Sequence, residues 1–149
     1  MTSQQWEGLE LDKDILVQGN KEYGPDACCF VPRRINNCIS IGAGGRTQHP
    51  FGVIKKSDFK NMRKGHSRPY VAVITTANVE QKGRRNLGYS ETAFGAHQIW
   101  QLEKARSIED AVSWYATQSC IRTDVADALL ARAWQLRLEN AKGIETTFL

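Results

Sequence analysis

Apolar and polar positions alternate along three short segments in the middle of the chain. The clearest is YVAVIT, Tyr70 to Thr75, which is rich in β-branched residues and bounded by turn formers. FGVIK (Phe51 to Lys55) precedes it and RRNLGYS (Arg84 to Ser90) follows it, each separated from it by a polar turn region. The pattern predicts a small antiparallel sheet of three strands.

The third of these strands is expected to carry two different faces. A period of two residues places Arg85, Leu87 and Tyr89 together on one face. The other face then consists of Arg84, Asn86 and Gly88. One face can therefore pack against the protein while the other presents polar groups outward.

A helix is expected directly after the third strand, over ETAFGAHQIWQLEKAR, Glu91 to Arg106. Ser90 or Thr92 can serve as its N-cap. Apolar residues recur along it at helical spacing and predict a stripe that covers the sheet. This stripe consists of Ala93, Ala96 and Trp100.

Two further helices are expected in the C-terminal region. Ser107 opens a capping box for IEDAVSWYATQ, and Thr123 caps DVADALLARAWQLRLENAK, which ends at Gly143. Trp114 and Trp134 lie at helical spacing, which predicts that both are core residues rather than platforms for stacked bases.

The charge of the chain is distributed unevenly. The whole protein carries a net charge of +4 over 149 residues. The segment from Arg46 to Arg85 contains ten lysines and arginines but two acidic residues, whereas both flanking segments are mildly acidic. A cluster of cations favours a polyanionic partner, and phosphate is the expected one because counterion release rewards cations placed together. The alternative interpretation of this basic segment is a solvated, lysine-rich loop.

The remaining composition excludes several classes of protein. No run of about eighteen apolar residues exists that would predict a membrane span, and the acidic N-terminus does not resemble a secretory signal. The four cysteines lack the paired spacing of a zinc site, so zinc is not expected, and we interpret them as reduced thiols in a cytosol. The glycine-rich IGAGGR lacks both phosphate-loop spacings and is interpreted as a linker.

The segment LDKDILVQGNKEYGPDACCFVPRRINN, Leu11 to Asn37, resembles the distal half of a large group of bacteriophage HNH-type, homing-endonuclease-like proteins. The resemblance implies a short ββα-metal unit that binds one divalent cation, Mg or Mn. Members usually carry an upstream segment with tryptophan and cysteine, so we interpret the chain as truncated at its N-terminus. The histidine general base from which the family takes its name is missing, since the first histidine is His49.

Within this resemblance the candidates for catalysis are Asp12, Lys13, Tyr23 and Asn37. Asp12 or Asp14 would hold the metal, with Asn36 or Asn37 as the last polar ligand at the end of a short helix, CFVPRRINN. Lys13 would contact the scissile phosphate, and Tyr23 would act as a base if a cation lowered its pKa. The alternative is structural, with turn and cap roles for the aspartates, a core position for the tyrosine and a helix C-cap for the asparagines.

The downstream run HPFGVI…YVAVI…QKGRRNLGYSETAFGAHQIWQLEKA is similar to the plant apetala/ethylene-response type of DNA-binding module. In that module three strands read the major groove and one helix backs them. The residues that carry the similarity are Leu87-Gly88 before the helix, Thr92 at its start, and Ala96 and Trp100 on its inner face. We therefore predict an α+β protein, with residues 1–41 as a degenerate HNH-like unit, 42–47 as a linker, 48–106 as the sheet and helix, and 107–149 as C-terminal helices.

The favoured function is binding of double-stranded DNA by a phage-encoded protein in the host cytoplasm. One alternative is a metal-dependent HNH-type endonuclease that nicks or cleaves DNA. Another is a phage inhibitor that binds a host or defence complex through a recycled endonuclease scaffold. The residues expected to contact DNA are Arg33, Arg34, Arg46, Lys55, Lys56, Arg63, Lys64, Arg68, Lys82, Arg84 and Arg85.

Overall fold

A computed structural model describes residues 8–18, 21, 24, 28–41, 48–56, 67–78 and 81–149, with the backbone alone for 76–78, 81 and 82. These residues form a two-stranded sheet, a three-stranded sheet and helices, which confirms the α+β class. In chain order the elements are β1 (Leu9–Asp12), β2 (Cys29–Pro32), α1 (Arg33–Cys38), β3 (Val53–Lys55), β4 (Tyr70–Asn78), β5 (Gln81–Ser90), α2 (Ala93–Tyr115) and α3 (Thr123–Lys142).

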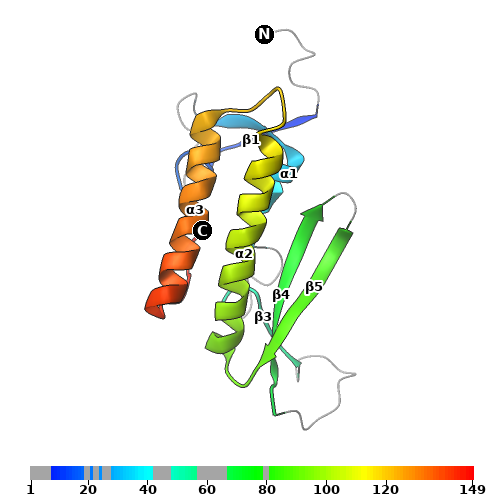
Figure 1. Cartoon of the computed structure of the whole chain (residues 1–149), viewed down its shortest axis with the longest axis vertical. Coiled ribbons are helices and arrows are strands. Elements are labelled where there is room, and N and C mark those ends of the chain that lie inside the picture. Colours follow the sequence, from blue (N-terminus) through cyan, green and yellow to red (C-terminus); the bar gives the residue numbers. More distant parts are fainter. Residues whose placement is uncertain are drawn as a thin grey trace.

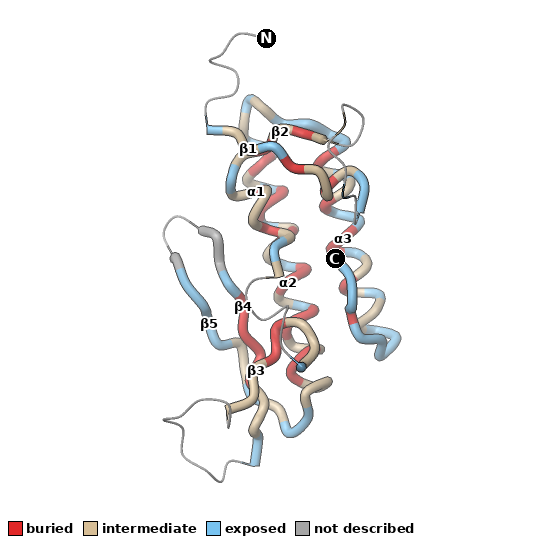
Figure 2. Tube along the Cα trace, turned by 180° about the vertical axis from the view of Figure 1, so that it is seen from behind, coloured by how far each residue is buried: buried red, intermediate tan, exposed pale blue. Residues whose placement is uncertain are grey.

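The two long helices, α2 and α3, lie side by side as an antiparallel pair (Figure 1). The three-stranded sheet flanks α2 on the side away from α3. The two-stranded sheet and α1 lie near the end of the pair where α2 finishes and α3 begins. Figure 2 shows the same arrangement from behind, with buried residues along α2 and along the half of β4 next to it.

The N-terminal elements form a ββα unit. Strands β1 and β2 pair antiparallel, with Asp12 opposite Cys29. Cys29 and Val31 are buried while Phe30 and Pro32, which alternate with them, are partly exposed, as in a strand packed on one face. The expected helix over CFVPRRINN is therefore wrong in its first half. Helix α1 begins at Arg33, after Pro32, whose restricted φ suits the residue that precedes a helix.

The three-stranded sheet has the antiparallel order β3-β4-β5 that the sequence pattern predicted. Its register is interrupted by a β-bulge. Ala72 pairs with Gly88, but Val73 pairs with Asn86, so Leu87 is an extra residue in β5. Because an extra residue shifts the alternation of side chains by one, the two ends of β5 do not share one period.

The bulge changes which residues of β5 face together. Residues directly opposite one another in an antiparallel pair lie on the same face. Ile74 is buried in the core, and its partner Arg85 therefore lies on the side of the sheet that faces α2. By the same pairing, Arg84, Asn86 and Tyr89 lie on the other side. The prediction that Arg85 and Tyr89 share a face is wrong, because the sequence pattern assumed an unbroken period of two.

Helix α2 is one continuous helix where two were expected. Thr92 is its N-cap, as predicted, and its hydroxyl accepts a hydrogen bond from the Gly95 amide at 3.0 Å. The expected break at Ser107 is absent, and the proposed boundary after residue 106 falls inside α2. Ala105, Ile108 and Val112 are buried on either side of Ser107. This unbroken apolar spacing keeps the chain helical, since tertiary packing outweighs the local preference of a serine for a cap.

Helix α3 ends at Gly143 as predicted, with the glycine in the left-handed conformation at φ 67°. Thr123 is its first helical residue rather than its cap. Arg122 occupies the cap position, and its side chain makes no capping hydrogen bond to the first turn. Trp134 is 67% exposed, so the prediction that it is a core residue is wrong. Ala133, the residue before it, belongs to the buried row of α3. One residue further along a helix is a rotation of about 100°, which points Trp134 away from the core.

The largest buried side chains are contributed by both long helices and by the smaller elements, and they form one hydrophobic cluster. At its centre, Trp100 lies against the chain at Gly52. A Cβ atom at position 52 would stand 2.1 Å from the Trp100 ring, and the backbone there has φ 74°, so only glycine fits. This contact holds the loop before β3 against α2. Among the described residues, no helix has both the length and the apolar character needed to cross a membrane.

Buried cations attach the N-terminal unit to the long helices. Arg132 of α3 is 5% exposed and donates to the backbone carbonyls of Asp14 and Ile15, at 2.8 and 3.2 Å. Lys104 of α2 is 3% exposed and donates to the carbonyl of Ser40 at 2.7 Å. Burial lowers the pKa of Lys104 to about 8. The unit therefore shares the core of the molecule and is anchored at both of its connecting loops.

Candidate functional site

The face of the sheet that points away from α2 carries the polar groups best placed to meet a ligand. Arg84 and Asn86 of β5 and Thr75 of β4 are exposed there, and Tyr89 is 46% exposed. Val71 and Val73 lie on the same face but are buried. The accessible part of this face, which we call the outer sheet face, is therefore formed by Thr75, Arg84, Asn86 and Tyr89.

A lysine extends the outer sheet face toward β3. The Lys56 ammonium lies 3.9 Å from the centroid of the Tyr89 ring, in a cation–π contact. The backbone amide of Lys56 also donates to the carbonyl of Pro69 at 2.9 Å, which holds this residue beside the start of β4. Lys56 therefore places a positive charge on the same surface as Arg84, beside the Tyr89 ring of β5.

Arg85 lies on the opposite side of the sheet from Arg84. Its guanidinium donates to a carboxylate oxygen of Glu103 on α2, at 2.6 Å. This exposed ion pair ties β5 to α2 and lowers the net positive charge on that side. Of two adjacent arginines that were both expected to contact DNA, one thus faces outward and the other pairs with the backing helix.

Strands β4 and β5 continue beyond β3 as a two-stranded ribbon. Strand β3 pairs with Tyr70 to Ala72, so among the described residues β4 has no strand partner other than β5 from Ile74 onward. Figure 1 shows this ribbon rising beside α2 and leaving it toward its tip. A two-stranded antiparallel ribbon has the width that the major groove of B-DNA admits.

The other cations expected to bind DNA have varied surroundings. Lys55 lies 5.8 Å from the centroid of the Tyr70 ring, and Arg68 is exposed. On α1, Arg33 is 3.6 Å from a Glu10 oxygen, while the Arg34 guanidinium stacks on the ring of Trp114 at 4.9 Å. Lys82 is described only in its backbone. Three of the expected residues lie outside the described part of the chain, namely Arg46, Arg63 and Lys64.

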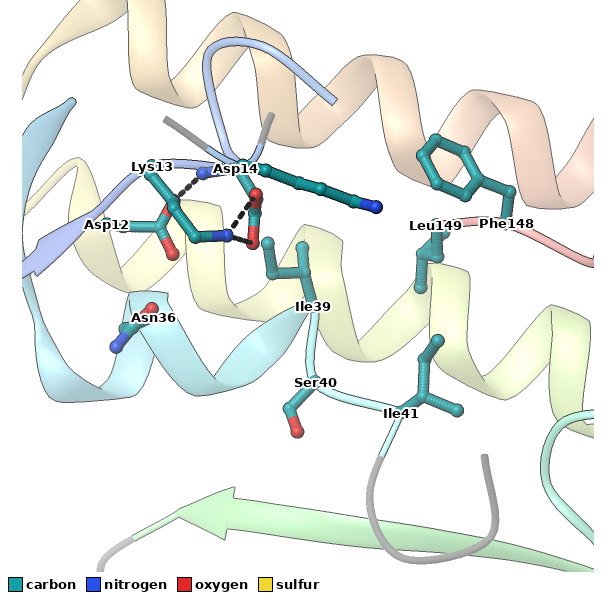
Figure 3. Close-up of a pocket in the computed structure, with 10 residues that line it drawn as sticks. Asp12, Lys13, Asp14, Asn36, Ile39, Ser40, Ile41, Phe148 and Leu149 are labelled. Atoms are coloured by element: carbon teal, nitrogen blue, oxygen red, sulfur yellow. Dashed lines mark hydrogen bonds and ion pairs between the residues drawn. The ribbon is translucent and has the colours of Figure 1, made fainter. Parts of the chain in front are cut away.

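The N-terminal unit forms one side of an open cleft of about 460 Å³ (Figure 3). The C-terminal tail closes the other side through Phe148 and Leu149. Its remaining lining residues are Asp12, Lys13, Asp14, Lys21, Asn36, Ile39, Ser40 and Ile41. Two of the predicted catalytic residues, Asp12 and Lys13, therefore lie in one cleft. Asn36 lines it but Asn37 does not, and Tyr23 is outside the described residues.

Asp12 has a structural role in this cleft. Its Oδ1 accepts hydrogen bonds from the backbone amides of Asp14 and Ile15, at 2.8 and 2.7 Å. This arrangement turns the chain at the end of β1, as aspartate does in Asx-type turns. Asp12 is 8% exposed. The turn role named as the structural alternative is thus present in the structure.

The neighbours of Asp12 are also engaged in contacts within the unit. The Lys13 ammonium donates to both oxygens of Asp14, at 2.8 and 3.0 Å, and Asn36 donates to Glu10 at 2.7 Å. A Mg or Mn ion prefers about six oxygen ligands. In the described ranges no three His, Cys, Asp or Glu side chains group together to hold a metal. The described polar side chains at this end of the cleft are thus engaged with one another, and a metal ion bound there stays a prediction.

No protein-family model, curated protein or solved structure shows significant similarity to this chain. The resemblances to HNH-type proteins and to the apetala/ethylene-response module therefore remain predictions. The sequence pattern grouped Asn86 with Arg84, as the structure does, although neither Asn86 nor Tyr89 was among the residues expected to contact DNA. The place of Tyr89 on this face depends on the bulge at Leu87, for which the sequence offers one weak signal, the glycine that follows it.

Proposed function

We propose that the protein binds double-stranded DNA with its outer sheet face. The observation that carries the proposal is the grouping of Arg84, Asn86 and Tyr89 on one exposed side of β5, with the Lys56 ammonium on the tyrosine ring. Arginine and asparagine are the side chains that most often read guanine and adenine in the major groove. The excess of positive charge between Arg46 and Arg85 supports attraction to phosphate.

The two adjacent arginines of β5 provide a matched test. Arg84→Gln and Arg85→Gln each remove one positive charge, and they differ in the face that loses it. Fluorescence anisotropy with a library of labelled duplexes at about 50 mM salt measures the affinity. We expect Arg84→Gln to weaken binding about tenfold or more, in line with the loss of one base-contacting arginine. We expect Arg85→Gln to change the affinity by less than about threefold, because its partner is Glu103.

Two results would contradict this proposal. One is the absence of duplex binding at low salt by the folded protein. The other is a larger loss of affinity in Arg85→Gln than in Arg84→Gln, which would move the DNA to the side of the sheet that carries α2. Circular dichroism of both variants provides the control for folding.

The endonuclease alternative is tested in the same preparation. The ββα order of the N-terminal unit and the shared cleft of Asp12 and Lys13 are the observations that favour it. Cleavage of duplex DNA that requires Mn²⁺ and stops on addition of a chelator would support a nuclease. Binding without cleavage would leave DNA recognition as the function. The absence of both binding and cleavage would favour the third alternative, an inhibitor that acts on a protein.

A further inference from the structure

Asn86 stands in the middle of β5 at a position where the fold does not account for an asparagine. In the described sheet β5 is an edge strand (Figure 1). Asparagine is depleted in strands, where β-branched and aromatic side chains are favoured. Asn86 is exposed, and in the described part of the chain its side chain makes no hydrogen bond. Its amide group can therefore offer both a donor and an acceptor to a ligand.

Arg84 lies two residues from Asn86 on the outer sheet face. Their partners in β4, Thr75 and Val73, are also two residues apart, so the register between them is regular. Two residues of an antiparallel strand span about 6.8 Å. Successive base pairs are about 3.4 Å apart along the DNA axis, and more along the course of the groove. A strand that follows the groove thus carries the two side chains over base pairs one or two steps apart.

The two side chains fit different bases. A guanidinium donates to both O6 and N7 of guanine, whereas the amide of asparagine donates to N7 of adenine and accepts from its N6 amino group. Arginine has no acceptor, so Arg84 cannot form the paired hydrogen bonds that Asn86 can form with adenine. Side by side, they are complementary to a G·C pair and an A·T pair in the major groove.

The other end of the outer sheet face carries a cation rather than a group that distinguishes bases. The Lys56 ammonium lies 3.9 Å from the centroid of the Tyr89 ring. The bulge at Leu87 separates Tyr89 from Asn86 along the strand. Lysine binds phosphate as a point charge, and the ring restricts where this charge lies. This end therefore suits the DNA backbone, whose contacts position a protein without carrying sequence information.

We propose that Asn86 determines the sequence preference of this protein. It binds the adenine of an A·T pair, Arg84 binds the guanine of a G·C pair one or two steps away, and Lys56 binds a backbone phosphate. This inference rests on the proposed DNA binding and specifies the class of duplex that is bound. Because the major groove distinguishes A·T from T·A, the orientation of the A·T pair matters as well.

Selection of binding sites from a random duplex library by the full wild-type chain is the first test. The selected duplexes should share a G·C pair and an A·T pair within two steps of each other, in one fixed orientation. Anisotropy titrations at about 100 mM salt then compare the selected duplex with one in which the A·T pair is reversed to T·A. We expect the wild type to bind the reversed duplex about tenfold or more weakly.

Three variants separate base recognition from backbone binding. Asn86→Ala should bind the two duplexes with affinities within about threefold of each other, because the groups that distinguish them are lost. Lys56→Gln should weaken both duplexes equally and reduce the magnitude of the salt slope by about 0.9. Arg85→Gln is the control on the opposite side of β5, where Arg85 pairs with Glu103, and it should keep the preference for the selected duplex.

The outcomes distinguish this inference from the DNA binding on which it rests. Retention of the preference in Asn86→Ala, or its loss in Lys56→Gln, would overturn the roles assigned to these residues. Duplex binding without a shared sequence would overturn the inference and leave DNA binding intact, whereas no duplex binding by the folded wild type would overturn both. Circular dichroism checks folding. If Asn86→Ala does not fold, Asn86→Thr replaces it, since threonine favours strands and cannot form the paired hydrogen bonds with adenine.

Discussion

At the scale of single residues, His97 is the side chain whose structural role is clearest. It is fully buried in α2. Its Nδ1 donates to the Phe51 carbonyl at 2.8 Å, and its Nε2 accepts from the Thr146 amide at 2.9 Å. The carbonyl can only accept and the amide can only donate, so the ring is neutral with its proton on Nδ1. His97 thus joins the loop before β3 and the C-terminal tail to α2.

This pairing predicts loss of stability in acid. Burial lowers the pKa of His97 below the value it has in the unfolded chain, against smaller opposing effects of the Phe51 hydrogen bond and of Glu145 and Glu139. The unfolded state therefore binds more protons between the two pKa values, and stability rises with pH across that window. The contribution of His97 is fully present above about pH 6.5 and is lost as the pH falls below it.

The measurement is urea unfolding at pH values from about 4.5 to about 7.5. We expect the free energy of unfolding to fall with decreasing pH in the wild type and to fall less in His97→Gln, which cannot gain a proton. The difference between the two proteins isolates His97 from His49 and His66. Equal slopes for wild type and variant would show that the ring titrates freely in the folded state.

At the scale of elements, the continuity of α2 is the feature that most affects the architecture. Because the helix passes Ser107 without a break, the same helix backs the sheet and also pairs with α3, through contacts that run from Gln98 to Glu109. The proposed DNA-binding part and the C-terminal part are therefore one rigid unit through α2 rather than two modules joined by a turn.

Substitution of Ser107 distinguishes the two descriptions of this segment. If Ser107 were an N-cap, Ser107→Ala would cost about 1 kcal/mol of stability. Inside a helix, alanine is the better residue, so we expect Ser107→Ala to be neutral or stabilising by a few tenths of a kcal/mol. Urea unfolding measures the difference, and Thr92→Ala is the positive control, with an expected loss of about 1 kcal/mol from a true cap. A loss in Ser107→Ala as large as that of the control would contradict a continuous helix.

At the scale of the whole molecule, charge is the property that the DNA-binding proposal depends on. The logarithm of the binding constant should fall linearly with the logarithm of salt concentration, with a slope of about −0.9 for each phosphate neutralised. We expect Arg84→Gln to reduce the magnitude of the slope by about 0.9 if this arginine meets a phosphate, and to leave it unchanged if it meets a base edge. Titrations between about 50 and about 300 mM salt measure the slope. A slope near zero for the wild type would contradict binding through the basic segment.

The sequence by itself determined the elements with strong local patterns. The three strands, the N-cap at Thr92 and the end of α3 at Gly143 follow from alternation, capping chemistry and the freedom of glycine, all of which act within a few residues. The basic character of the middle segment was equally evident, since charge is a sum over residues and needs no fold. The local patterns predicted the α+β class, which the structure confirms, and the charge is the basis for proposing a polyanionic partner.

Only the tertiary structure decided which residues face together. The bulge at Leu87 places Tyr89 on the face of Arg84 rather than on that of Arg85, and pairing between strands creates it, so no local pattern reports it. Packing against α3 and the sheet keeps α2 continuous through Ser107, and the rotation of α3 on its neighbours leaves Trp134 outside. In each case the deciding free energy comes from contacts between residues far apart in the chain, and these contacts are absent from any short stretch of sequence.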